Sequence, residues 1–166
     1  SLVQACIDYA ENRKTITFYA DVPAAKTPTE AITFGDAFES RHASFWYPWI
    51  TVDELDIPPS SYVLGAAVRK DASLGVHWNV GNQGLNGADG LEYSATKTED
   101  NTLNEANINT IMYYPGKGIV AWGGRTKSAV VAWRFINDSE LWNYIARMID
   151  EGAADIVYRP INAETM

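Results

Sequence analysis

Residues 104–125, NEANINTIMYYPGKGIVAWGGR, are the stretch that decides the fold of this chain. The stretch holds two short apolar runs, 108–114 and 119–123, and the turn formers between them are Pro115, Gly116 and Gly118. Proline cannot donate to a sheet ladder and glycine tolerates positive φ, so the pattern predicts a strand, a tight turn and a second strand. None of these residues is His, Cys, Asp or Ser. The stretch therefore indicates an architectural element and not a reactive centre.

The length of the chain, 166 residues, predicts a single domain over residues 1–166. Hydrophobic residues make up 46% of the sequence and aromatic residues 12%, which indicates a folded globule and not a disordered chain. Helix-patterned sequence follows Ser1 directly, and the chain stops after a strand-like run. We therefore expect an excised core fragment of a larger protein.

The charge of the chain is strongly acidic, with 21 Asp and Glu residues against 13 Lys and Arg and a formal net charge of −8. Phosphate backbones favour a positive surface, so this charge disfavours nucleic acid as a partner. The single cysteine, Cys6, has no internal partner for a disulfide. No run is long enough to cross a bilayer and no signal-peptide pattern occurs, so we expect no membrane partner.

Helix and strand patterns alternate from the start of the chain. The spacing of apolar residues predicts a helix over 2–10, and the β-branched and aromatic run 16–22 predicts a strand. Thr27 followed by Glu30 is a capping-box pattern, which predicts that a helix starts there and ends near residue 40.

The next strand and helix are marked by prolines. The run 43–50, ASFWYPWI, is nearly continuous in apolar and aromatic residues, which is typical of a strand covered on both faces. Pro48 predicts a bulge or the end of that strand. Pro58 and Pro59 then introduce a predicted helix over 60–73.

The middle of the chain is less regular. Residues 75–90 are rich in Gly and Asn and predict a long irregular connection, and 90–95 predicts a short strand. Thr96 with Glu99 forms a second capping-box pattern, which predicts a helix that reaches residue 106.

The last third of the chain predicts strand, helix and strand. The apolar and aromatic run 130–136 predicts a strand, and Asn137 with Glu140 gives a third capping signal. The helix that follows is predicted to end at Gly152, and 154–158 predicts a final strand. Alternating helices and strands imply parallel strands with helical crossovers. We therefore expect an α/β layered fold with a mostly parallel or mixed central sheet flanked by helices.

Patterns for catalytic, metal and nucleotide chemistry are weak. His42 and His77 have no second His, Cys or paired carboxylate at ligand spacing, so we expect no metal site. No Gly-x-Ser-x-Gly elbow occurs, although the members of a Ser-His-Asp triad meet only in space and composition leaves a triad open. The run 118–126, GIVAWGGRT, has Gly124 where a phosphate loop needs Lys, so no nucleotide cofactor is expected. These features favour binding or assembly over catalysis.

Two other function classes stay open. A small α/β hydrolase would need a pocket with convergent titratable groups, and two isolated histidines argue against it. A carbohydrate-binding module would use exposed aromatic residues; we expect most tryptophans in the core and one or two on a partner surface. The six tryptophans are Trp46, Trp49, Trp78, Trp122, Trp133 and Trp142.

Several segments, in the same order, resemble the sheath proteins of contractile phage tails and related contractile injection devices. The segments are 43–50, 58–75 (PPSSYVLGAAVRKDASLG), Trp78 with 84–91, 103–125 with its Tyr-Pro-Gly-Lys-Gly and Val-Ala-Trp-Gly-Gly-Arg motifs, 133–137 and 141–145. The resemblance covers residues 2–160, and the joint order of the segments makes it specific. The residues that match the family's motifs are Pro48, Trp49, Pro58, Pro59, Gly65, Arg69, Asp71, Gly75, Asn104, Asn107, Pro115, Gly116, Gly118, Trp122, Gly123, Arg125 and Tyr144.

The resemblance implies a non-enzymatic structural subunit without a cofactor. It implies a helical array of sheath copies around a tail tube and above a baseplate, which contracts and drives the tube through the host cell envelope. It also implies a place in the virion after synthesis in the host cytoplasm, and a fragment that lacks the terminal arms of the full subunit. The sheath of a tail-like bacteriocin or of a secretion system fits the same resemblance.

Overall fold

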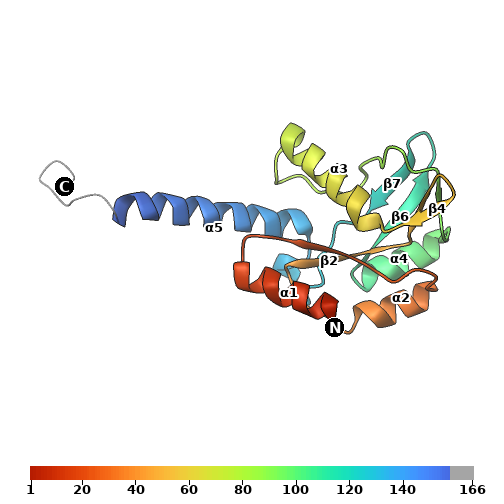
Figure 1. Ribbon diagram of the computed structural model, residues 1–166, viewed down its shortest axis with the longest axis horizontal. Helices are drawn as coiled ribbons and strands as arrows, with labels where there is room; N and C mark the ends of the chain where they lie inside the picture. Colours follow the sequence, from red (N-terminus) through yellow and green to blue (C-terminus); the bar gives the residue numbers. More distant parts are fainter. Residues whose placement is uncertain (158–166) are drawn as a thin grey trace, which may run out of the picture.

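The computed structural model describes residues 1–157 and has a four-stranded sheet at its centre (Figure 1). In spatial order its strands are β1 (Phe18–Asp21), β2 (Ala43–Tyr47), β6 (Ile108–Tyr114) and β7 (Gly118–Trp122). The first three strands run parallel, and β7 pairs antiparallel with β6. The sheet is therefore mixed, and the predicted α/β layered fold is confirmed.

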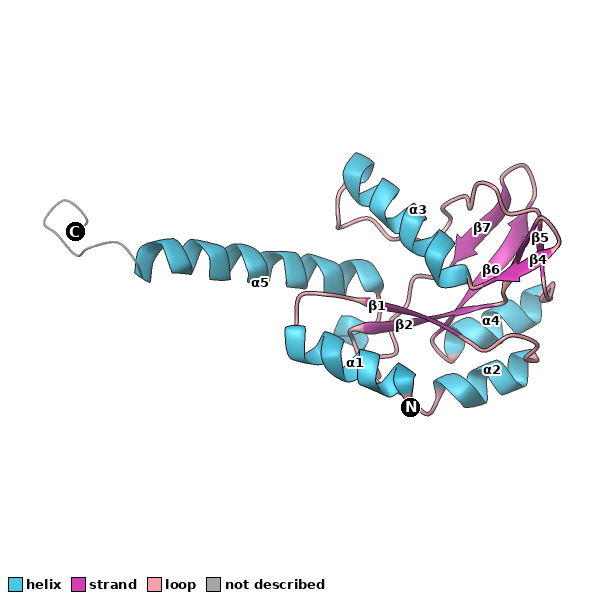
Figure 2. Ribbon diagram, in the orientation of Figure 1, coloured by secondary structure: helices cyan, strands magenta, loops and turns pink. Residues whose placement is uncertain are grey.

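Helices cover both faces of this sheet (Figure 2). One face carries α1 (Leu2–Arg13), α2 (Pro28–Gly35) and α4 (Lys97–Glu105), and the other carries α3 (Pro59–Leu74). The helix α2 ends at Gly35 instead of near residue 40. No helix within residues 1–157 is both long enough and apolar enough to span a bilayer.

The central strand β2 is buried on both faces, as its apolar sequence predicts. Side chains alternate along a strand, so Trp46 packs with Val63 of α3 on one face. Phe45 and Tyr47 point to the other face, where they pack with Leu103 of α4. Two apolar cores, one on each side of the sheet, therefore hold the three layers together.

The predicted strand, turn and strand over 104–125 is confirmed as the β6–β7 hairpin. Tyr114 pairs with Gly118 at its end, and the turn places Gly116 at φ 80° and Gly118 at φ 78°. The irregular connection 75–89 covers the outer edge of β7, where the amide of Leu85 donates to the carbonyl of Ile119 at 2.9 Å.

A second, smaller sheet was not predicted as a unit, although one of its strands falls within the predicted short strand 90–95. β2 ends at Tyr47, one residue before Pro48, and a new strand begins at Ile50. The small sheet is antiparallel, and its strands are only two or three residues long, so they leave little pattern in the sequence. In spatial order they are β4 (Leu55–Ile57), β3 (Ile50–Val52) and β5 (Gly90–Leu91).

Both capping boxes in the first two thirds of the chain are confirmed. At the start of α2 the amide of Thr27 donates to Glu30 Oε2 at 2.9 Å, and the amide of Glu30 donates to Thr27 Oγ1 at 3.3 Å. Thr96 and Glu99 make the same pair of bonds at the start of α4, at 2.8 and 3.3 Å. The backbone and hydroxyl bonds from each threonine lower the pKa of the glutamate that accepts them.

The prediction of a strand over 130–136 is wrong. The segment contains a short 3₁₀ turn, η1 (Val131–Trp133), and only Phe135 forms a bridge, with Arg125. Val130, Val131 and Phe135 are exposed, so this apolar run does not enter the sheet. Apolar composition without regular alternation misled the prediction here.

The ends of the last helix, α5 (Ile136–Val157), also differ from the prediction. The third capping box is wrong, because the helix already starts at Ile136 and Glu140 turns toward β1 instead of back to Asn137. The predicted stop at Gly152 and the strand from residue 154 are wrong as well, since the helix runs through to Val157; residue 158 lies outside the described part. One glycine costs a helix only about 1 kcal/mol relative to alanine, which does not stop it.

Candidate assembly surface

Four of the residues that match the family's sequence motifs lie where strands and helices are held together, and we call them the framework motif residues. The indole of Trp49 donates to the carbonyl of Val22 at 2.7 Å, which ties the end of β2 to the end of β1. Pro59 is the first residue of α3, where a missing N–H costs nothing, and the next amide, of Ser60, donates to Asp21 Oδ1 at 2.7 Å. These contacts fix α3 on the sheet. The framework motif residues are Pro48, Trp49, Pro58 and Pro59.

A buried asparagine fixes the course of the chain after β7. Gly123 and Gly124 have φ of 114° and 109°, and Asn109 Oδ1 accepts from the amides of Gly124 and Arg125, both at 2.6 Å. The amide group of Asn109 donates to the carbonyls of Phe45 and Arg125 at 3.1 and 2.8 Å. All four bonds use one fully buried side chain, so Asn109 joins β2, β6 and the turn after β7.

This turn brings Arg125 to the end of α4. Its Nη1 donates to the carbonyl of Asn104 at 2.7 Å, and Asn107, at φ 58°, donates its amide to the same carbonyl at 2.9 Å. Burial lowers the pKa of Arg125. The guanidinium lines a cleft of 480 Å³. The other residues around the cleft are Asn79, Gly81, Asn82, Asn101, Asn104, Glu105, Trp122, Gly123 and Phe135.

Four motif residues lie on α3 or at its end. Gly65 faces open space, and Arg69 donates from Nη2 to the carbonyl of Gly84 at 2.8 Å, which holds the irregular connection against the helix. Asp71 lies beside the buried ammonium group of this helix, and Gly75 ends the helix at φ 93°. These residues are therefore spread around α3 and do not form one site.

Three motif residues lie at the exposed tip of the β6–β7 hairpin. Pro115 and Gly116 are exposed and Gly118 is half-buried, and together they surround Lys117 at the end of the β6–β7 hairpin. The Lys117 ammonium lies 5.7 Å from the ring centroid of Tyr114. The tip therefore carries a lysine away from the sheet.

A buried cluster of charges joins α3, β1 and α5. Lys70 is only 1% exposed; its Nζ donates to the carbonyl of Trp78 at 2.6 Å and lies 2.6 Å from Asp71 Oδ1 and 3.7 Å from Glu140 Oε2. The hydroxyl of Tyr19 donates to Glu140 Oε1 at 2.8 Å. Burial raises the pKa of both Glu140 and Tyr19. The cluster therefore anchors the first turns of α5 to the body.

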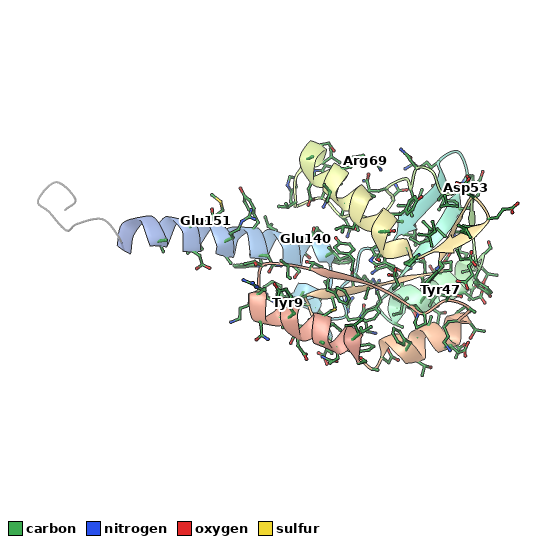
Figure 3. The ribbon with its side chains drawn as sticks, viewed as in Figure 1. Tyr9, Tyr47, Asp53, Arg69, Glu140 and Glu151 are labelled. Atoms are coloured by element: carbon green, nitrogen blue, oxygen red, sulfur yellow. The ribbon has the colours of Figure 1, made fainter. Side chains whose placement is uncertain are left out.

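Beyond this anchor α5 leaves the body and projects (Figures 1 and 3). Figure 3 labels Glu140 where the helix meets the body and Glu151 on the projecting part. Every residue over 144–154 is exposed. Three of them, Ile145, Met148 and Ile149, form an apolar stripe along the projecting part, and the motif residue Tyr144 stands at its base. An exposed apolar stripe of this kind is typical of an interaction surface.

The residues tested for catalytic chemistry do not converge. His42 is 4% exposed and is bonded to the Ile16 carbonyl and to Arg41, while His77 is exposed. Within the described chain, no group of three or more His, Cys, Asp or Glu residues could hold a metal ion. Trp46 is buried, and Trp78 and Trp142 are more than half exposed.

Sequence reasoning missed three buried polar residues. Lys70 follows Val63, Ala66 and Ala67 at helical spacing, so its place on the buried face of α3 was readable from the sequence. Asn109 interrupts an apolar strand, which was a second readable signal. No pattern in the sequence marks Lys127 as buried. Its Nζ lies 3.2 Å from Asp36 Oδ1 and donates to the carbonyl of Ala106 at 2.9 Å.

Solved structures with the same fold come from contractile particles. A chain in the cryo-EM structure of the anti-feeding prophage baseplate matches with a TM-score of 0.82 at 26% identity, over 97% of this chain and 43% of that chain. A chain in the contracted sheath complex of PVC, an extracellular contractile injection system, matches with 0.78 at 27% identity, over 87% of this chain and 42% of that one.

A more distant likeness shows the fold alone. The sheath tail protein of Desulfitobacterium hafniense matches with a TM-score of 0.58 at 13% identity, over 98% of this chain and 45% of that chain. This chain therefore spans less than half the length of each of these three relatives. A search of curated proteins finds no match.

The family comparison agrees with these structures. A model of the phage tail sheath protein central domain matches residues 1–127, which contain both apolar cores up to β7 and most of the motif residues. The chain belongs to the family of phage tail sheath protein central domains.

Proposed function

We propose that this chain is the central part of a structural subunit of a contractile sheath, which surrounds a tail tube and contracts to drive it through a host cell envelope. The observation that supports this most directly is the family match over residues 1–127, together with the likeness to a chain of a contracted sheath. The exposed α5 stripe fits a protein that acts by contact with other chains.

The partners that follow from this proposal are other copies of the sheath protein, the tail tube and the baseplate. The related structures, a baseplate of the anti-feeding prophage and a contracted sheath complex of PVC, support the first and last of these. The proposed location is the virion, after synthesis in the host cytoplasm. The net charge of −8 supports the absence of a nucleic-acid partner. We propose no enzymatic activity and no membrane partner.

The chain is proposed to be one domain within a larger subunit. Support comes from its coverage of 43% of the anti-feeding prophage chain. The motif residues then divide into two proposed roles. The framework motif residues Pro48, Trp49, Pro58 and Pro59 maintain the fold, whereas the hairpin tip, the Arg125 cleft and Tyr144 belong to surfaces that meet neighbouring chains.

Assembly of the full subunit that contains this chain tests the proposal. The purified subunit is expected to form hollow cylinders in negative-stain electron microscopy. Small discrete oligomers at every protein concentration would contradict the proposal.

A second candidate is the same sheath role in a particle other than a phage. Two relatives with more than 25% identity belong to the anti-feeding prophage and to PVC, an extracellular contractile injection system. Particles purified from the native source distinguish the two: a phage tail comes with a capsid and packaged DNA, and an injection device comes without them.

A further inference from the structure

A cavity of 300 Å³ lies where α3, the chain that enters β1 and α5 meet. It adjoins the buried charge cluster of Lys70, Asp71 and Glu140. Part of its wall is apolar and part is polar. The apolar wall is formed by Ile16, Leu64, Val76 and Tyr144, and the polar wall by Thr15, Thr17, Tyr19, Asp71, Glu140, Asn143 and Arg147.

The polar wall is only partly satisfied within residues 1–157: Asp71 Oδ1 and Glu140 Oε2 lie 2.6 and 3.7 Å from the shared Lys70 ammonium, whereas Thr17 Oγ1 and Asn143 Nδ2 have no partner. Residues 1–157 contain seven buried side-chain atoms without a hydrogen-bond partner, and four of them belong to residues of this cavity. Asn143, which is 5% exposed, is the most buried of the four. A buried polar atom without a partner is costly, so the cavity is built to receive a polar group. The four atoms are Thr17 Oγ1, Asp71 Oδ1, Glu140 Oε2 and Asn143 Nδ2.

The charge of the cavity selects a cation. Two carboxylates, of Asp71 and Glu140, face one buried ammonium, of Lys70, so the cluster holds one excess negative charge. Arg147 lies at the cavity wall, but its Nε is 3.8 Å from Glu151 on the same helix. The Asp71 and Glu140 oxygens share one ammonium, Thr17 Oγ1 is an oxygen without a partner, and Asn143 offers a further oxygen when its amide group is flipped.

The side chain of a second lysine, in addition to Lys70, matches the chemistry of the polar and apolar walls of this cavity. An ammonium group carries three donors and no acceptor, and its aliphatic stem packs against apolar side chains such as Ile16 and Leu64. Three of the six lysines form ion pairs with carboxylates of residues 1–157, and the other three form none with that part of the chain. Among the described residues, the lysines without a carboxylate partner are Lys14, Lys97 and Lys117.

Only one of these lysines stands on a projecting element. Lys14 directly precedes the cavity wall of its own chain, and Lys97 is the first residue of α4. Lys117 is presented at the tip of the β6–β7 hairpin, with exposed residues before it. The hairpin tip and the base of α5 lie in different parts of the molecule (Figure 1). A contact between them joins two unlike surfaces, and such a heterologous contact repeats into an open array.

We propose that Lys117 at the hairpin tip of one copy inserts into the cavity between α3, β1 and α5 of a second copy. The inference rests on the proposed sheath function, because it names the contact between copies. The motif residues Pro115, Gly116 and Gly118 then shape the tip that carries the lysine, and Asp71 and Tyr144 line the cavity that receives it.

The full sheath subunit tests this contact with a Lys117→Ala variant and a Lys97→Ala control, which removes an exposed lysine outside the contact. Removing one partner of a desolvated charge pair is expected to weaken association by about tenfold or more. The wild type and Lys97→Ala are expected to form cylinders at the same protein concentration, and Lys117→Ala only at a concentration about tenfold higher or more. Thermal unfolding checks that all three fold alike.

Cross-linking locates the contact independently of the variants. A carbodiimide that joins lysines to carboxylates is applied to cylinders grown from a mixture of ¹⁴N- and ¹⁵N-labelled wild type. Mass spectrometry is expected to find Lys117 joined to Asp71 or Glu140 in peptides of mixed label. Cylinders of Lys117→Ala at the wild-type concentration, or cross-links of Lys117 only to other carboxylates, would overturn the contact and leave the sheath proposal intact. A wild-type subunit that forms no cylinders overturns both.

Discussion

Asn109 is the single side chain on which the path from β7 to α5 depends most. It is 0% exposed and makes four hydrogen bonds, two of them from the amides of Gly124 and Arg125. Asn109→Ala leaves these amides buried without acceptors, so we expect the free energy of unfolding to fall by about 2–4 kcal/mol. Urea unfolding followed by tryptophan fluorescence measures the change. The control Asn101→Ala, at an exposed position of α4, is expected to stay within about 0.5 kcal/mol of the wild type.

His42 makes the stability of the chain depend on pH. Its Nδ1 lies 3.1 Å from the carbonyl of Ile16 and its Nε2 accepts from Arg41 Nε at 3.0 Å, which fits a neutral ring with the proton on Nδ1. Burial lowers the pKa of His42, so the unfolded chain takes up a proton at a higher pH than the folded chain. The stabilisation is complete above the unfolded pKa of about 6.5 and is lost as pH falls through the folded pKa.

The variant His42→Gln tests this pH dependence, because glutamine does not titrate. Urea unfolding between pH 7 and pH 5 is expected to show a larger loss of stability in the wild type than in His42→Gln. Comparison of the two proteins removes the contribution of the buried carboxyls of Asp21, Asp100 and Glu140, whose pKa burial raises. Equal slopes in both proteins would contradict a neutral buried His42.

Among the elements, those with local chemical signals were predicted and those without were not. The β6–β7 hairpin and the starts of α2 and α4 have turn formers or capping boxes, and each was found where the sequence indicated. The run 130–136 and the end of α5 have only composition to mark them. In the small sheet, β5 lies within the predicted strand 90–95, whereas β3 and β4 are shorter than the window in which alternation can be recognised.

The candidate surface was less predictable than the fold. The resemblance supplied the motif residues, but it did not say that Arg125 lines a cleft while Gly65 faces open space. The buried cluster joins Tyr19, Lys70 and Glu140 from three separate elements, and the spacing of residues within one element carries no information about such a meeting. Only the packing of α5 across β1 and α3 brings them together.

The capping box of α4 offers a test at the scale of one helix. Thr96→Ala removes the hydroxyl that accepts from the amide of Glu99, so we expect a loss of about 1 kcal/mol in the free energy of unfolding. Thr98→Ala serves as the control, because Thr98 is exposed within the same helix and its side chain caps no amide. Thermal or urea unfolding measures both; an equal effect of the two variants would show that the cap is not what stabilises the helix.

The projecting part of α5 is expected to be the least protected helix of the described chain. Residues 144–154 are all exposed, and a helical segment of that length without packing is marginal in water. Amide hydrogen exchange measured by mass spectrometry or NMR is expected to be faster over 144–154 than over α3, whose inner face is buried. Protection of 144–154 equal to that of α3 in a dilute monomer would contradict the expectation.

At the scale of the whole molecule, the net charge of −8 opposes the self-association that the exposed apolar stripe of α5 favours. Acidic copies repel each other at low salt, which keeps the exposed Ile145, Met148 and Ile149 apart. Raising the ionic strength from 0.01 to 1 M shortens the Debye length from about 30 to about 3 Å, so the repulsion is screened while the apolar attraction stays. We expect self-association of this chain to increase with salt, as measured by sedimentation velocity or light scattering.

Two variants with the same added charge separate the stripe from the net charge. Ile149→Glu places a carboxylate in the stripe, at a side chain that is 63% exposed, and is expected to abolish the salt-induced association. Ala154→Glu adds the same charge on the opposite side of the helix and is expected to associate nearly as the wild type does. If both variants lose the association equally, the net charge and not the stripe controls it. If neither loses it, the contact between copies lies outside α5.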